Sequence, residues 1–333
     1  SQVLSKDSAK HLGLILDKRL DFITHSEEKI TKANKGVGVI KKLQSVLPRK
    51  TLINIYKSFV RPQLDYGDLV FDKPHLSNFQ KKMESVQYKA CLAITGAIQG
   101  SSREKLYAEL GLECLEKRRW YRKMCLFWKI VNGHAPKYLL DLLPDKQNSF
   151  NPVRRNNFVL FNLNTDYYAN SFFPYCVKEW NTLDINIRNS PSIAIFKKHL
   201  LTFIRPAPAH VFDVLDHSGL KLLTRLRLRM SHLNEHKFHN FREILNPLCS
   251  CGSETESNSH FLLHCQHYVV LRQSLFDLLQ KLDESILQLS DDNLLNLLLY
   301  GNANLFSRKQ NTEILNATIS FLKNSKRFDV TLF

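Results

Sequence analysis

The stretch LEKRRWYRKMCLFWKIV, residues Leu115–Val131, decides the fold class of this 333-residue chain. Its largest apolar side chains recur at i, i+4, i+7, i+8 and i+11, the spacing of one helical face: Trp120, Met124, Phe127, Trp128 and Val131. Its cations Arg118, Arg122 and Lys129 fall on the opposite face. We expect the tryptophans in a core and the cations exposed, either as a solvated face or along a nucleic-acid backbone.

Helical periodicity continues on both sides of this stretch. It predicts helices at about 24–47, 49–60, 77–95, 101–110, 172–182, 192–203 and 220–230, and further helices from 266 to about 324. The second of these should stop near Arg61 and Pro62, and the alternation over 226–230 would also suit a strand. Leu12, Leu14 and Leu16 alternate, which predicts a short strand near the start. The sequence therefore predicts a mainly α protein.

Polar and proline-rich stretches divide the chain. Pro144–Arg155 is polar and reads as a linker or exposed loop, and Pro206 and Pro208 mark a second boundary. We expect five regions: a short strand segment at 1–21, a helical region at 22–143, a linker or hairpin at 144–170, a helical connector at 171–205, and a C-terminal helical domain at 206–333.

The charge of the chain favours a polyanionic partner. The formal charge is +16, and residues 1–150 carry 27 Lys and Arg against 15 Asp and Glu, a balance of +12. No run of about 18 apolar residues exists, so no membrane partner is expected. We find no secretory leader at the start of the sequence, and we therefore expect an intracellular protein of the cytoplasm or nucleus. Because the sequence begins with Ser1 and not with Met, we expect it to be a piece of a longer reading frame.

Three of the seven cysteines lie within one short segment, Cys249-x-Cys251-x8-His260-x4-Cys265. Two close thiols on a turn, with a histidine and a thiol on a helical face, supply the four ligands of a tetrahedral zinc ion. Four protein ligands leave no open position for catalytic water, so the zinc would be structural. The alternative is that these thiols are small buried hydrophobes. His264 and His267 are possible substitute ligands.

No catalytic site is visible in the sequence. The one adjacent acidic pair, Asp291 and Asp292, precedes an apolar run and is better explained by helix capping. Asp65, Asp68 and Asp72 follow an i, i+3, i+7 spacing that could imitate a metal site, but no further carboxylate supports one. Lys221, Arg225 and Arg229 recur at i, i+4 and i+8 and form a second basic helical face.

Several stretches resemble the end of LINE-type (non-LTR) retrotransposon reverse transcriptases of the jockey and CR-one kind. They cover essentially the whole chain: Lys10–Asp17, Leu47–Lys50, Ile55–Gly67, Gln87–Gly96, Arg118–Trp120, the Cys–His cluster and Lys326–Val330. The resemblance identifies residues 1–21 as the end of the polymerase palm, the helices after them as its thumb, and 249–265 as its CCHC zinc knuckle. The tight Cys249-x-Cys251 spacing departs from the family's usual CxxC and leaves Cys251 uncertain as a ligand.

The resemblance implies a nucleic-acid-binding C-terminal part of an RNA-directed DNA polymerase, without its own catalytic palm. The paired aspartates that hold Mg²⁺, and the fingers, lie before this sequence in that family. The implied partners are the missing fingers and palm, and RNA and DNA as template–primer duplex, element RNA or target DNA. A zinc-stabilised helical adaptor between proteins, or a decayed transposon copy, remain alternatives.

The cations expected to contact the nucleic-acid backbone come from the two basic helices and from the thumb-like region. They are Lys29, Lys32, Lys35, Lys41, Lys42, Arg49, Lys50, Arg118, Arg122, Lys221, Arg225 and Arg229.

Overall fold

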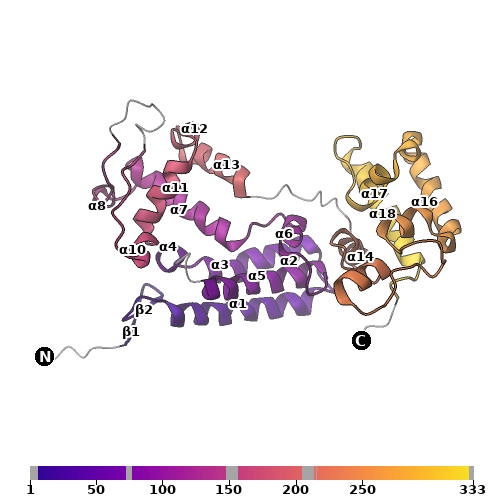
Figure 1. Ribbon diagram of the computed structural model, residues 1–333, viewed down its shortest axis with the longest axis horizontal. Coiled ribbons are helices and arrows are strands. Elements are labelled where there is room, and N and C mark those ends of the chain that lie inside the picture. The colour runs from indigo at the N-terminus through magenta and orange to yellow at the C-terminus, as the bar shows by residue number, and fades with distance from the viewer. Residues whose placement is uncertain (1–6, 73–76, 148–156, 205–213, 215, 330–333) are drawn as a thin grey trace. The chain divides into compact units, whose positions relative to one another are not determined.

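The computed structural model describes residues 7–72, 77–147, 157–204, 214 and 216–329. Within these residues the protein is mainly α, as the sequence predicts, and its sheet is a two-stranded hairpin (Figure 1). The elements up to Val131 are β1 (Ser8–His11), β2 (Leu14–Asp17), α1 (Ile23–Leu43), α2 (Arg49–Ile55), η1 (Tyr56–Val60), α3 (Arg61–Asp65), α4 (Asp68–Phe71), α5 (Ser77–Thr95), α6 (Arg103–Leu110) and α7 (Leu115–Val131).

The later elements are shorter on average. They are α8 (Lys137–Leu140), α10 (Asp166–Ala169), α11 (Phe172–Thr182), α12 (Ile185–Arg188), α13 (Ile193–Ile204), α14 (His217–Arg227), α15 (Asn234–His236), η2 (Lys237–Phe241), η3 (His260–His264), η4 (Gln266–Tyr268), α16 (Val269–Leu282), η5 (Glu284–Gln288), α17 (Asp291–Tyr300) and α18 (Arg308–Asn324). The helices predicted at 77–95, 115–131 and 172–182 are confirmed, and the stretch around 220–230 is helical through Arg227.

Two sequence predictions are wrong in detail. The single strand over Leu12–Leu16 is a hairpin, because Leu12 and Gly13 both adopt positive φ and reverse the chain between β1 and β2. The helix expected to stop near Pro62 continues through a π-helical turn into α3. Pro62 lies in the first turn of α3, where a missing backbone N–H costs nothing, so proline does not end the helical path.

The chain packs into two compact units. Unit 1 comprises Ser1–Gly36, Lys57–Gln87 and Leu112–Pro206, and unit 2 comprises Val37–Tyr56, Tyr88–Gly111 and Ala207–Phe333. The region expected at 22–143 contributes to both, and α1 and α5 each contain a point of division. The boundary expected at Pro206–Pro208 lies outside the described residues.

The core of unit 1 forms around α7. Helices α11 and α13 pack along its apolar face, where Met124, Phe127 and Trp128 are buried as the sequence predicts. The Phe127 ring centroid lies 5.3 Å from that of Trp180 and 6.0 Å from that of Phe158. Aromatic rings at such separations stabilise a core beyond the area they bury.

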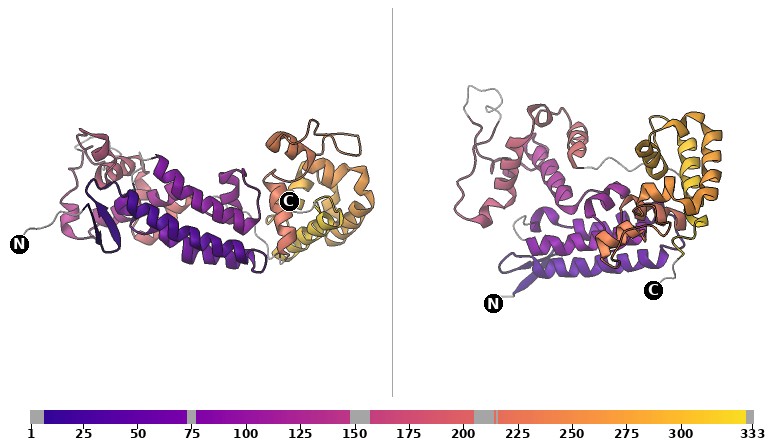
Figure 2. Two further views of the ribbon diagram at one scale, coloured as in Figure 1. Left: turned by 90° about the horizontal axis from the view of Figure 1, so that it is seen from below. Right: turned by 45° about the vertical axis from the view of Figure 1, so that its right-hand side comes forward.

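The core of unit 2 is formed mainly by its C-terminal helices. Helices α14, α16 and α17 pack against α18, seen in orange to yellow in Figure 2. A Cβ atom on Gly219 of α14 would lie 2.0 Å from Cγ2 of Ile319 on α18, so only glycine permits this approach. Asp216 caps α14 by accepting a hydrogen bond from the Gly219 backbone N–H at 3.0 Å, and its Oδ2 lies 2.5 Å from Nζ of Lys323.

Candidate metal centre and basic surfaces

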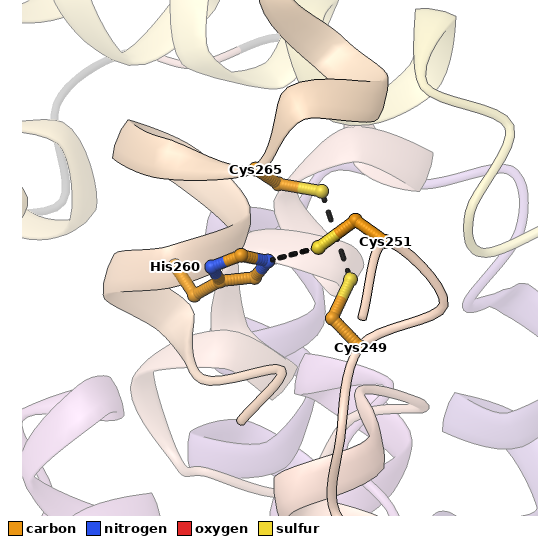
Figure 3. Close-up of side chains that lie close together, drawn as sticks. All are labelled: Cys249, Cys251, His260 and Cys265. Carbon is orange, nitrogen blue, oxygen red and sulfur yellow. Dashed lines mark hydrogen bonds between the residues drawn. The ribbon is translucent and has the colours of Figure 1, made fainter. Parts of the chain in front are cut away.

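The four residues predicted as metal ligands converge in unit 2. One ligand atom from each of Cys249, Cys251, His260 and Cys265 lies within 4.8 Å of all the others (Figure 3). Sγ of Cys249 is 3.6 Å from Sγ of Cys265, and Sγ of Cys251 is 3.2 Å from Nε2 of His260. A tetrahedral metal ion bound by thiolates at about 2.3 Å needs a separation of about 3.8 Å between each pair of ligand atoms. The cluster can therefore hold a metal ion, and Cys251 belongs to it despite its tight spacing.

A short turn and a helical turn bring these ligands together. The backbone pairs at Leu248 and Thr255 in an antiparallel bridge, and Gly252 closes the turn with φ of +76° and a hydrogen bond from its N–H to the Cys249 carbonyl at 2.9 Å. His260 begins η3, and the backbone N–H of Cys265, just after η3, donates to the His260 carbonyl at 2.7 Å. The turn on which the sequence places the two close thiols is thus present.

The orientation of the His260 imidazole suits metal binding. Its Nδ1 lies 2.7 Å from Oε1 of Glu254, which leaves Nε2 facing Cys251. A carboxylate on the second ring nitrogen fixes the tautomer and raises the basicity of a metal-binding histidine. Glu254 therefore supports the centre, a role that the sequence analysis missed and that its position six residues before His260 could have suggested.

The thiols of the cluster differ in acidity. Hydrogen bonds from Ser253 lower the pKa of Cys251 to about 6. Burial, together with the neighbouring Cys249 thiol, raises the pKa of Cys265 to about 12. Thiolate is the metal-binding form, so a cation in the cluster would deprotonate Cys265 and displace a proton.

The two histidines proposed as substitute ligands lie outside the cluster. Nε2 of His264 is 2.9 Å from Oδ2 of Asp291, and Nδ1 of His267 is 3.3 Å from Oγ of Ser250. Asp291 begins α17 after Ser290, although the Ser290 side chain makes no capping hydrogen bond. The ligand set is therefore the four residues of the predicted pattern.

Five of the twelve cations expected to contact phosphates are exposed and have no ion-pair partner among the described residues: Lys35, Lys41, Lys42, Lys50 and Arg229. Lys32 is also exposed, but it pairs with Glu28 one turn earlier on α1. Lys32, Lys35 and Lys42 are spaced by three and seven residues and so follow one face of α1.

Arg49, one of the twelve cations expected to contact phosphates, is buried in unit 2 and is not available to a nucleic acid. Its Nη1 lies 2.9 Å from Oε1 of Glu109 on α6, and Nη1 of Arg227 on α14 lies 2.6 Å from the same oxygen. Arg49 Nη2 also donates to Oγ1 of Thr224 at 2.6 Å. Burial opposes the charge of Glu109, but the two guanidinium groups outweigh it and lower the pKa of that carboxyl.

Arg118 and Arg122 do not form the exposed face expected for α7. Arg118 Nη2 lies 2.7 Å from Asp65 Oδ2, and Arg122 Nε lies 3.1 Å from Asp68 Oδ2. Asp72 accepts from the buried Lys123 at 2.8 Å. The three aspartates that could imitate a metal site are therefore partners of α7 cations, and α4, which begins at Asp68, packs against α7.

Lys29, Lys221 and Arg225 are only partly available. Lys29 is 8% exposed with its ammonium 4.2 Å from the Tyr66 ring centroid, and burial lowers its pKa. Arg225 donates from Nε to the Gly96 carbonyl at 2.9 Å, and Lys221 packs against the same glycine. The second basic face on α14 thus serves mainly to attach α14 to the end of α5, both within unit 2.

No family model, no curated protein and no solved structure matches this chain. In the part of the chain that the structure describes, no helix combines the length and the apolar character needed to cross a bilayer. The chemistry of the Cys–His cluster and the distribution of exposed cations therefore carry the functional argument.

Proposed function

We propose that this chain is the nucleic-acid-binding C-terminal part of a LINE-type reverse transcriptase, stabilised by a structural zinc ion. The resemblance over Lys10–Asp17 and Ile55–Gly67 motivates the family. Three thiols and one imidazole whose ligand atoms lie within 4.8 Å of one another form a donor set that favours zinc, because soft ligands select it over Mg²⁺ or Ca²⁺. With all four positions filled by protein, the ion supports folding and leaves no site for catalysis.

One observation carries the nucleic-acid proposal. The end of α1 and the start of α2, both within unit 2, present Lys41, Lys42 and Lys50, all exposed and without carboxylate partners among the described residues. By contrast, carboxylates pair with Arg49, Arg118 and Arg122. Exposed lysines whose charge is not neutralised bind a phosphate backbone with release of its counterions.

The test is the salt dependence of binding to a primer–template duplex. Each phosphate contact contributes about 0.9 to the slope of log affinity against log salt concentration. We expect a steep slope for the wild-type chain, and a slope lower by up to about 3 for the triple variant Lys41→Ala, Lys42→Ala, Lys50→Ala. Fluorescence anisotropy between 50 and 300 mM salt, as a rough working range, measures it.

A matched control removes the same charge elsewhere. Lys197, Lys198 and Lys281 are exposed helix residues outside this surface, and their triple alanine variant should keep the wild-type slope. Equal slopes for the two triple variants would contradict the placement of the interface. Affinity that does not change with salt would contradict nucleic-acid binding and favour the protein adaptor.

A further inference from the structure

A cavity of about 440 Å³ lies in unit 1, and none of its lining residues belongs to α1 or α2. It is bordered by the end of α7, by the junction between α12 and α13, and by the bridged residues Lys146 and Phe158. Its volume lies in the range of about 300–1,000 Å³ that is typical of small-ligand sites. Nothing in the proposed zinc or duplex binding uses it.

Four of the eleven described lining residues carry aromatic rings. Trp128, Phe158 and Trp180 come from the core, and the exposed His134 lies parallel to Trp128, with 9° between the ring planes and 5.5 Å between centroids. The imidazole of His134 is thus a planar heterocycle that stacks on the Trp128 indole at the cavity. Nucleobases are planar heterocycles that stack on aromatic side chains in the same way.

The indole N–H of Trp128 is buried and has no hydrogen-bond acceptor among the described residues. The indole of Trp120, by contrast, donates to Oε2 of Glu179 at 2.9 Å. A buried donor without an acceptor costs free energy, and native structures rarely keep one unless a water molecule or a ligand satisfies it. Beside this cavity, the missing acceptor points to a bound group.

The charged residues of the lining are cations. Lys146 is exposed and Arg188 is buried, and no Asp or Glu is among the described lining residues. Arg188 donates from Nη1 to Oδ1 of Asn157 at 2.6 Å, and burial lowers the pKa of its guanidinium. An anion beside the buried guanidinium would favour its charged form, and phosphate accepts hydrogen bonds from both residue types.

The walls of the cavity are held in place before any ligand binds. Asn181 accepts from the Phe158 backbone N–H at 3.0 Å and donates to the Phe158 carbonyl at 2.9 Å. Among the other lining residues, Ser190 donates from Oγ to the Ile187 carbonyl at 2.7 Å and lies 3.3 Å from Nδ1 of His199. A preformed site loses little conformational freedom on binding.

From these observations we propose that the cavity binds one unpaired nucleotide, with its base beside Trp128 and His134 and its phosphate between Lys146 and Arg188. Aromatic stacking, an unsatisfied N–H and two cations match the base and the phosphate of a nucleotide better than an apolar ligand or a bare anion. The proposal rests on the nucleic-acid binding proposed above and assigns a second, single-stranded contact to unit 1.

Intrinsic fluorescence tests the proposal, because two of the three tryptophans of the chain line the cavity. Titration of the full chain with adenosine 5′-monophosphate should change the emission and saturate. Adenosine and inorganic phosphate should each bind at least about tenfold more weakly, since each lacks one half of the interaction. A single-stranded oligonucleotide should compete with the mononucleotide, and a blunt duplex should not.

Two variants keep the test sharp if one of them folds poorly. Lys146→Ala should weaken mononucleotide binding about tenfold, the expected effect of losing one charged hydrogen bond, whereas Lys137→Ala, an exposed lysine outside the cavity, should not. Trp128→Phe keeps an aromatic ring but removes the N–H donor, and should also weaken binding. Equal mononucleotide affinities for all variants and the wild type, or no saturable response, would overturn the proposal.

The two proposals fail in different ways. Steep salt-dependent duplex binding without any mononucleotide response removes the cavity proposal and leaves the proposed function intact. A saturable mononucleotide response that Lys146→Ala weakens, without duplex binding, removes the proposed function and retains the cavity as a site for a free nucleotide.

Discussion

Asp68 shows how burial alters the chemistry of a single carboxyl group. Its side chain is buried at the start of α4, and burial raises its pKa from 3.8 to about 6, although Arg122 opposes the shift. The folded state therefore holds the Asp68 proton more tightly than the unfolded state. This stabilisation is complete below about pH 4 and is lost as the pH rises through 6.

We expect Asp68→Asn to remove the loss of stability that the wild type shows as the pH rises, because the amide is neutral at every pH in this range. The difference in unfolding free energy, variant minus wild type, should therefore increase by about 1–2 kcal/mol from pH 5 to pH 7.5. Urea unfolding followed by tryptophan emission measures the difference, since Trp120, Trp128 and Trp180 all lie in unit 1 with Asp68. Asp141→Asn, at an exposed position, is the control, and a difference that stays constant with pH would refute the assignment.

At the scale of the element, helices were predictable and their charged partners were not. The bounds of α5, α7 and α11 follow from apolar spacing and local punctuation, which nearby residues determine. Arg49, however, meets Glu109, 60 residues away, and Glu109 meets Arg227 118 residues further on. The sequence around a helical cation does not show whether water, phosphate or a distant carboxylate surrounds its charge in the folded protein.

The metal cluster was predictable for the opposite reason. Its ligands fall within 17 residues, from Cys249 to Cys265, and the spacing alone suggested a common centre. The cavity in unit 1 was not predicted, because its walls come from five separate places in the sequence and its residues carry no motif. Short-range chemistry is visible in a single sequence, whereas sites assembled by tertiary packing are not.

Glu109 links three helices of unit 2, and its replacement should be costly. In Glu109→Gln the guanidinium groups of Arg49 and Arg227 remain buried without a compensating charge. Removing one partner of a buried ion pair typically costs about 3–5 kcal/mol, and we expect a loss of that size from urea unfolding followed by circular dichroism. Glu104→Gln, at an exposed position on the same helix, should cost less than about 0.5 kcal/mol. A loss below about 1 kcal/mol for Glu109→Gln would show that the pairs are not a stabilising feature.

At the scale of the whole molecule, each unit contains a hydrophobic cluster of its own. The core cluster around α7 and the cluster around α18 share no residue. Phe261, Leu262 and Leu263 of η3, between the ligands His260 and Cys265, belong to the second cluster. A metal at the cluster therefore supports the core of unit 2 directly, while the three tryptophans report on unit 1.

This separation makes metal removal a test with two readouts. The purified chain should contain one zinc ion, and Cys249→Ser should abolish it whereas Cys114→Ser, which lies outside the cluster, should not. Chelation of the wild type should lower the unfolding midpoint followed by circular dichroism at 222 nm, roughly the helical minimum, because binding energy for a structural zinc is folding energy. The midpoint followed by tryptophan emission should shift much less. Equal shifts in both signals would contradict a stabilising effect of the metal that is confined to unit 2.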